Sequence, residues 1–175
     1  MNNLRLSPLI SADEIKTRVQ KIGEALTEKY RGQEIVAVGV LKGSFMFFAD
    51  LIRAIDTDLT CDFCGVSSYT EMHSSGEVKL TLDLSRSIRD RHVILVEDIV
   101  DTGLTMNYLR RHLQTHKPKS LITASLLLKP DALKEECPVD HVGFKIPNDF
   151  VVGYGLDYQG YFRNLPYIAQ VSNIN

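Results

Sequence analysis

Residues 101–105, DTGLT, combine hydroxyl side chains with a glycine immediately before a stretch of helical periodicity. The first turn of a helix carries backbone N–H groups without intrahelical partners, and the helix dipole adds partial positive charge there. Such a loop can bind a phosphate, here through Thr102, Gly103 and Thr105. It matches neither GxxxxGK(S/T) nor GxGxxG, so it does not indicate a nucleoside triphosphate or dinucleotide site. On these residues alone, a capped helix after a strand is the simpler interpretation.

Three carboxylates change that interpretation. Glu97 and Asp98 are adjacent, and Asp101 follows three residues later. A phosphate beside them would be strongly repelled unless a cation or a hydrogen-bond donor lay between. A Mg²⁺ ion or a ribose diol would meet that need, because both bind carboxylate oxygens. The order of these residues therefore fits a sugar phosphate with two vicinal hydroxyls, and Asp101 is left for another role.

Alternating strands and helices must position this loop. Ser11 and Glu14 form a capping-box pattern that predicts a helix from there to about Tyr30. Further helices are expected over 45–55, 104–116 and, as a short one, 130–136. The expected strands are 34–41, 60–69, 92–96, 121–128, 139–147 and 150–158.

Three of the strands, 34–41, 92–96 and 121–128, are nearly continuous apolar runs. Strands of this kind, separated by helices, indicate an α/β fold whose parallel sheet is flanked by helices on both faces. Ligands of such sheets bind beyond the carboxyl ends of the strands. The segments VLKGS, VEDIVDTGLT and LLLKP all lie at such ends, so we expect them to converge on one crevice.

The charge balance limits the classes of molecule that the protein can bind. The 175 residues include 20 Lys and Arg against 22 Asp and Glu, for a formal net charge of −2. This balance argues against a mainly nucleic-acid-binding surface. No stretch approaches the roughly 20 apolar residues of a membrane span, and MNNLRLSPLI lacks the features of a signal peptide. We therefore expect a cytoplasmic, single-domain protein that binds neither nucleic acid nor membranes.

Several motifs together resemble one family. VILVEDIVDTGLTM is similar to the phosphoribosyl pyrophosphate signature of the phosphoribosyltransferases. GVLKGSFMFFADL resembles the pyrophosphate loop of their 6-oxopurine branch, SSY its lid, and FVVGYGLDYQGYFRNLPYI its purine-binding and C-terminal segment. The motifs occur in the family's order from Val36 to Ile168.

The resemblance implies a reaction and an architecture. The family transfers ribose 5-phosphate from phosphoribosyl pyrophosphate to a purine nitrogen, uses Mg²⁺ and releases pyrophosphate; for this branch the bases are hypoxanthine and guanine. Its members are commonly homodimers or homotetramers. The implied architecture is a type I phosphoribosyltransferase fold over 1–175, with a core of about 34–140, a hood from about 1–10 and 141–175, and a mobile lid of about 67–79.

The resemblance also implies roles for the residues from Glu97 to Thr105. Glu97 and Asp98 would hold the ribose diol and help order the metal, and Asp101 would act on the purine nitrogen as general base. Residues 101–105 would bind the 5-phosphate. Leu104 stands where many family members have lysine, so backbone and hydroxyl donors would hold the phosphate instead.

Other implied contacts lie at three further strand ends. Leu41, Lys42 and Gly43 match the pyrophosphate loop, in which the family has a cis peptide equivalent to Leu41–Lys42. Lys129 would donate a hydrogen bond to the purine 6-oxo group, which an adenine amino group cannot accept. Ser68 and Tyr69 belong to the implied lid. In isolation, the two lysines would be read as exposed charges at strand ends.

The C-terminal segment would complete the site. Phe150 would stack on the purine and Val151 would offer its backbone to the ring edge, although both could be core strand residues. Asp157 would bind a second Mg²⁺, and Arg163 would contact pyrophosphate. The implied metal ligands are therefore Glu97, Asp98 and Asp157.

Two other functions compete with this hypothesis. One is a regulator that keeps the fold and binds RNA, which would need a basic face. The other is a phosphoribosyltransferase for adenine or orotate, which the segment after Phe150 disfavours. His112 and His116 lie one helical turn apart, but no acidic partner is near them in the sequence, so we interpret them as a solvated helix face rather than a metal site.

Overall fold

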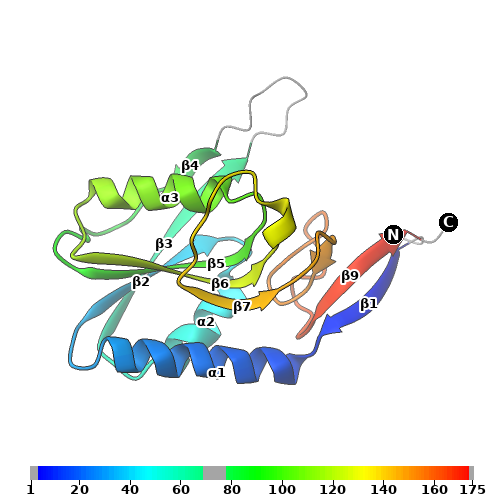
Figure 1. Ribbon diagram of the computed structural model, residues 1–175, viewed down its shortest axis with the longest axis horizontal. Helices are drawn as coiled ribbons and strands as arrows, with labels where there is room; N and C mark the ends of the chain where they lie inside the picture. Colours follow the sequence, from blue (N-terminus) through cyan, green and yellow to red (C-terminus); the bar gives the residue numbers. More distant parts are fainter. Residues whose placement is uncertain (1–3, 69–77, 174–175) are drawn as a thin grey trace.

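The structure, a computed structural model, describes residues 4–68 and 78–173. Its larger sheet has six strands in the order β4-β3-β2-β5-β6-β7 (Figure 1). All of its neighbouring strands pair in parallel except β3 and β4, which pair antiparallel. The strands are β2 (Ile35–Leu41), β3 (Leu59–Ser68), β4 (Val78–Leu82), β5 (His92–Val100), β6 (Ser120–Leu128) and β7 (His141–Lys145). The predicted α/β class is confirmed.

Helices cover both faces of this sheet. α1 (Ala12–Lys29) and α2 (Phe45–Ala54) lie on one face, and α3 (Leu104–Thr115) lies on the other (Figure 1). The predicted capping box begins α1, since the Ser11 N–H donates to Glu14 Oε2 over 2.9 Å and the Glu14 N–H donates to Ser11 Oγ over 3.3 Å. Two separate hydrophobic clusters fill the layers. The sheet is therefore buried on both faces, as its apolar strands require.

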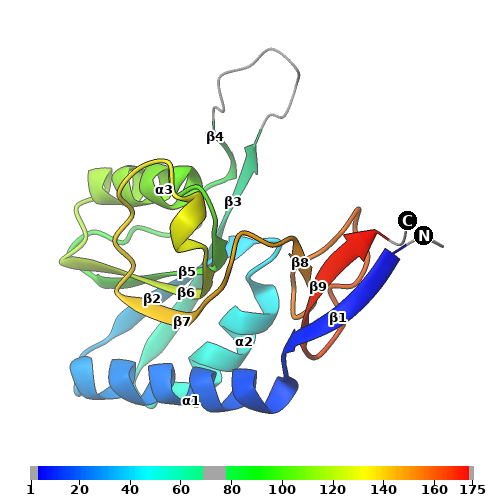
Figure 2. The same ribbon diagram turned by 45° about the vertical axis from the view of Figure 1, so that its right-hand side comes forward.

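A second, antiparallel sheet is formed by both ends of the chain, within the segments expected to make the hood. Its order is β1-β9-β8, from β1 (Leu4–Ile10), β9 (Ile168–Asn173) and β8 (Val151–Val152). Figure 2 shows β1 and β9 side by side at one end of the molecule. The expected hood boundary at residue 141 was too early, because β7 pairs with β6 in the larger sheet.

Other expected elements also differ. Only Val151–Val152 of the expected strand 150–158 is extended, because Gly153, Tyr154 and Gly155 have positive φ angles of 101°, 48° and 103°. The short helix expected after Lys129 is one turn, η1 (Pro130–Ala132). Strands β1, β4 and β9 were not predicted. They are only partly buried, so they lack the continuous apolar runs of the central strands.

Ser68 is the last residue of β3, while Tyr69 and most of the expected lid lie outside the described residues. In the part of the chain that the structure describes, no helix is both long and apolar enough to cross a bilayer.

Candidate active site

Strand β5 carries the first two carboxylates into the sheet. It pairs with β6 from His92 to Val100, so Glu97 and Asp98 lie in the strand and not in the loop expected after residue 96. Glu97 is buried, and its Oε2 has no hydrogen-bond partner among the described residues. Burial, together with the neighbouring Asp98, raises the pKa of Glu97 well above its usual value. Two consecutive residues of β5 are thus acidic, and burial opposes the ionisation of both.

Asp98 lies directly against the loop that follows β2. Burial raises the pKa of Asp98 to about 6. A Cβ atom added to Gly43 would be 1.7 Å from Asp98 Oδ2, so any larger residue there requires the Asp98 side chain or the loop to move. The peptide bond between Leu41 and Lys42 is cis, in agreement with the resemblance. The ends of β2 and β5 therefore converge as predicted.

The predicted phosphate loop follows β5. Gly103 precedes the first residue of α3 with a φ of +83°, a left-handed conformation that favours glycine. A Cβ there would also be 2.9 Å from Cys137 Cβ. Glycine at this position therefore allows both the sharp entry into α3 and close packing against the segment after β6.

Asp101 and Lys129 form an ion pair across the ends of β5 and β6. Lys129 Nζ donates to Asp101 Oδ2 over 2.8 Å. The lysine side chain is 8% exposed, whereas that of Asp101 is 47% exposed. Lys129 is thus a buried cation at the base of the crevice and not the solvated strand end that its position alone suggests.

The hood contributes a second ion pair and an aromatic ring. Arg163 Nη2 lies 2.5 Å from Asp157 Oδ1, and Arg163 Nη1 donates to the Gly155 carbonyl over 2.5 Å. Phe150 is 52% exposed and meets Tyr158 edge to face at 5.8 Å between ring centroids. An exposed ring beside a crevice can stack on a planar ligand.

Two adjoining cavities gather most of the predicted residues. The first, about 250 Å³, is lined by Gly43, Asp98, Ile99, Asp101, Lys129, Phe150, Val151, Leu156, Asp157 and Arg163. The second, about 240 Å³, is lined by Glu97, Asp98, Ile99, Val100, Asp101, Thr102, Gly103, Thr105 and Met106. Both include Asp98 and Asp101, which therefore lie where the two cavities meet.

The predicted and observed linings differ in a few places. Among the predicted site residues whose side chains the structure describes, Leu41, Lys42 and Leu104 line neither cavity. Ile99, Val100, Met106 and Leu156 line the two cavities but were not predicted, since apolar residues carry no chemical signal. Sequence context could have indicated two of them, because Ile99 lies between the carboxylates and Leu156 precedes Asp157.

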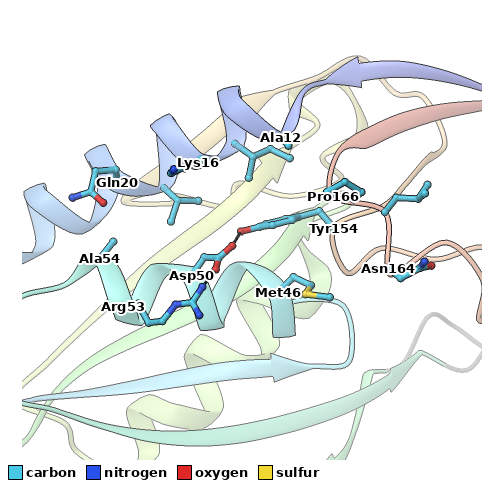
Figure 3. Close-up of a pocket in the computed structure, with 13 residues that line it drawn as sticks. Ala12, Lys16, Gln20, Met46, Asp50, Arg53, Ala54, Tyr154, Asn164 and Pro166 are labelled. Carbon is cyan, nitrogen blue, oxygen red and sulfur yellow. Dashed lines mark hydrogen bonds and ion pairs between the residues drawn. The ribbon is translucent and has the colours of Figure 1, made fainter.

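A larger cavity of about 530 Å³ lies elsewhere, between α1, α2 and the hood (Figure 3). Tyr154 points into it and donates a hydrogen bond to Asp50 Oδ2 over 2.5 Å. None of its lining residues belongs to the predicted site. The smaller cavities carry the converging carboxylates and the buried lysine, so they form the candidate active site.

The carboxylates fit a hard divalent cation. Mg²⁺ prefers oxygen ligands and is usually bound through one or two carboxylates, with waters and phosphate oxygens completing its shell. Glu97 has an unpartnered buried oxygen, and burial raises the pKa values of Glu97 and Asp98, so a bound cation would favour the ionised form of both carboxyls. Asp157 lies on the other side of the crevice but is paired with Arg163. This donor set suits Mg²⁺ better than a soft metal.

The fold and the site together define a class of enzyme. The chain matches the phosphoribosyl transferase domain family over residues 11–159. The chain therefore belongs to the phosphoribosyltransferase family and is an enzyme of that class.

Its relatives narrow the class further. The chain is 48% identical over 162 residues to the hypoxanthine-guanine phosphoribosyltransferase of Bacillus subtilis, covering 92% of this chain and 90% of that one. A crystal structure of a hypoxanthine-guanine phosphoribosyltransferase from Bacillus anthracis is similar with a TM-score of 0.90 and 43% identity, covering 97% and 100% of the two chains. The Trypanosoma cruzi hypoxanthine phosphoribosyltransferase in complex with the product IMP has a TM-score of 0.88 and 40% identity, covering 97% and 95%.

Proposed function

We propose that the protein transfers the 5-phosphoribosyl group from phosphoribosyl pyrophosphate to hypoxanthine or guanine, giving IMP or GMP and pyrophosphate in purine salvage. The observation that carries this proposal is the Lys129–Asp101 pair, 2.8 Å long, in a cavity lined also by Phe150. Lys129 donates to the 6-oxo group of the base, Phe150 stacks on the ring, and Asp101 takes the ring proton. Val151 borders the same cavity and offers backbone groups to the ring edge.

The rest of the crevice suits the donor. Thr102, Gly103 and Thr105 line the second cavity at the start of α3 and bind the 5-phosphate. Glu97 and Asp98 accept hydrogen bonds from the ribose hydroxyls. As the bond to pyrophosphate breaks, positive charge grows on the ribose, and these carboxylates stabilise it.

Magnesium is the proposed cofactor, with Glu97, Asp98 and Asp157 as the residues that hold it directly or through water. When bound, Mg²⁺ supplies positive charge that neutralises the pyrophosphate leaving group. Arg163, with Lys42 and Gly43 at the end of β2, adds donors for the same group. Asp157 must exchange part of its contact with Arg163 for the metal.

Removal of the Asp98 charge should stabilise the metal-free protein in a pH-dependent way. The folded-state pKa of about 6 lies above the ordinary value of 3.8, so ionisation of this carboxyl costs folding stability. The cost is absent below about pH 4, grows between about pH 4 and pH 6 and is fully present above that range. A shift of this size corresponds to about 3 kcal/mol, so Asp98→Asn should raise the melting temperature by roughly 6–12 °C at about pH 7.5, and by little at about pH 4.

Calorimetry with EDTA measures this difference. Adding Mg²⁺ should then stabilise the wild type more than Asp98→Asn, because the variant has lost a ligand. Equal melting temperatures at pH 7.5 together with equal gains from Mg²⁺ would contradict both the buried charge and the metal assignment.

Lys129→Met should weaken the selection of 6-oxopurines. Methionine keeps the buried stem but loses the charged donor, whose hydrogen bond is worth about 1.5–3 kcal/mol. We expect the hypoxanthine-to-adenine ratio of kcat/KM to fall by roughly 10- to 100-fold, mainly through slower use of hypoxanthine. An unaltered ratio would remove Lys129 from the role of base selector.

The proposed function is tested by measuring pyrophosphate release with Mg²⁺ and phosphoribosyl pyrophosphate. Hypoxanthine, guanine, xanthine and adenine are offered in separate reactions, with a reaction lacking base as the control. Turnover of hypoxanthine or guanine, with adenine inert, is the expected result. If the donor binds but no base reacts, a regulator built on the same fold becomes the better proposal.

Two properties of the intact protein belong to the same proposal. We propose a homodimer or homotetramer, which light scattering of the purified protein would distinguish from a monomer. We also propose a cytoplasmic location, supported by Cys61, Cys64 and Cys137, which are all free thiols.

A further inference from the structure

A cluster of potential metal ligands lies outside the active site. His112 belongs to the last turn of α3, His116 caps the end of that helix, and Asp83 directly follows β4. From the sequence, we interpreted the two histidines as a solvated helix face because no acidic residue lies near them in the chain. The tertiary structure brings Asp83, 29 residues before His112, into contact with that residue. One ligand atom from each of the three side chains lies within 4.8 Å of the other two.

Neighbouring groups fix the orientation of these ligands. His112 Nε2 is 2.9 Å from Asp83 Oδ1, and the Leu84 N–H donates to the same oxygen over 2.8 Å. The Tyr108 ring is nearly parallel to the His112 ring, with an interplanar angle of 5°. The His116 ring meets the His112 ring edge to face, with 5.1 Å between centroids. The three side chains are therefore already gathered without a metal.

We propose that Asp83, His112 and His116 bind a divalent transition-metal ion of the zinc class. Two imidazole nitrogens and one carboxylate oxygen are a donor set that zinc accepts, with water at the fourth position. Imidazole ligands disfavour Mg²⁺, which prefers oxygen, so this site and the carboxylates of the active site select different ions. Histidines one helical turn apart face the same side of a helix, which allows one ion to contact both.

At this position, a bound ion would stabilise the fold by linking two segments of the chain. The cluster lies at the end of α3 opposite the phosphate loop, roughly 12–18 Å away along the helix axis. An ion there would join the end of α3 to the segment after β4. Strand β4 lies at the edge of the sheet and, among the described residues, pairs with β3 alone. Such an ion binds the folded chain and not the unfolded one, so it raises the melting temperature.

The test is a titration of the tag-free, EDTA-treated full chain with Zn²⁺, followed by calorimetric binding and thermal unfolding. At a free Zn²⁺ concentration of about 100 times Kd, the melting temperature should rise by roughly 5–10 °C. His116→Gln should weaken binding by at least about tenfold. The matched control is His141→Gln, which removes a histidine outside the cluster and should leave binding unchanged.

His116→Gln is the decisive variant because, within the described part of the chain, the His116 side chain makes no hydrogen bond, so its loss should leave the fold intact. His112→Gln also removes the bond to Asp83, so its metal response is compared with its own metal-free melting temperature. Co²⁺ gives an independent readout, since its visible absorption changes on imidazole ligation. The proposal is overturned if Zn²⁺ binds His116→Gln as tightly as the wild type, which would place the ion elsewhere, or if the wild type shows no binding.

Discussion

Asp101→Asn is expected to slow the forward reaction by about 10²–10⁴-fold, roughly 3–5 kcal/mol of activation free energy. Asparagine has the shape of aspartate and can still accept the hydrogen bond that Lys129 Nζ donates over 2.8 Å. It cannot accept a proton from the purine ring at neutral pH. The variant should therefore lose general-base catalysis and keep its fold. Steady-state kinetics with hypoxanthine measures the loss.

The matched control is Asp131→Asn, which removes an exposed carboxylate from η1, close to Lys129 in the sequence. It should leave kcat unchanged. Binding of phosphoribosyl pyrophosphate should be largely retained in Asp101→Asn, because the phosphate loop and the two carboxylates of β5 are intact. An undiminished rate would show that another group accepts the proton.

Gly43→Ala is expected to lower kcat/KM by about 100-fold or more. The backbone of Gly43 has no left-handed φ, so alanine is not excluded by conformation. The obstacle is contact, since the new Cβ would lie 1.7 Å from Asp98 Oδ2 and 2.5 Å from its Cγ. Either the Asp98 side chain or the loop after β2 must move, and a displacement of about 1 Å at a reacting centre can reduce the rate 10²-fold.

Gly32→Ala serves as the control for this substitution. Gly32 has a φ of +68°, and nothing lies within 4 Å of a Cβ added there, so alanine should cost about 1 kcal/mol of stability through backbone strain alone. Its kcat/KM should be that of the wild type. If Gly43→Ala were equally active, the close contact with Asp98 would have no part in positioning the site.

The sequence alone predicted the features that depend on neighbouring residues. The capping box of Ser11 and Glu14 fixed the start of α1, and continuous apolar runs located β2, β5 and β6. Each pattern follows the periodicity of its own helix or strand, so a short stretch of sequence is enough to recognise it. The same holds for the segment from Glu97 to Thr105, whose acidic and hydroxyl side chains are close together in the sequence.

Contacts between distant segments were decided only by the tertiary structure. Strand pairing with β6 buried Glu97 and extended β5 beyond its apolar run. Packing placed Gly43 against Asp98, and the edge strand β4 brought Asp83 to His112. Left-handed backbone after Val152 turned an expected strand into a loop that carries Asp157 and Arg163 to the crevice. Local spacing predicts which groups are present, but burial and pairing depend on which segments meet, and that is determined when the whole chain packs.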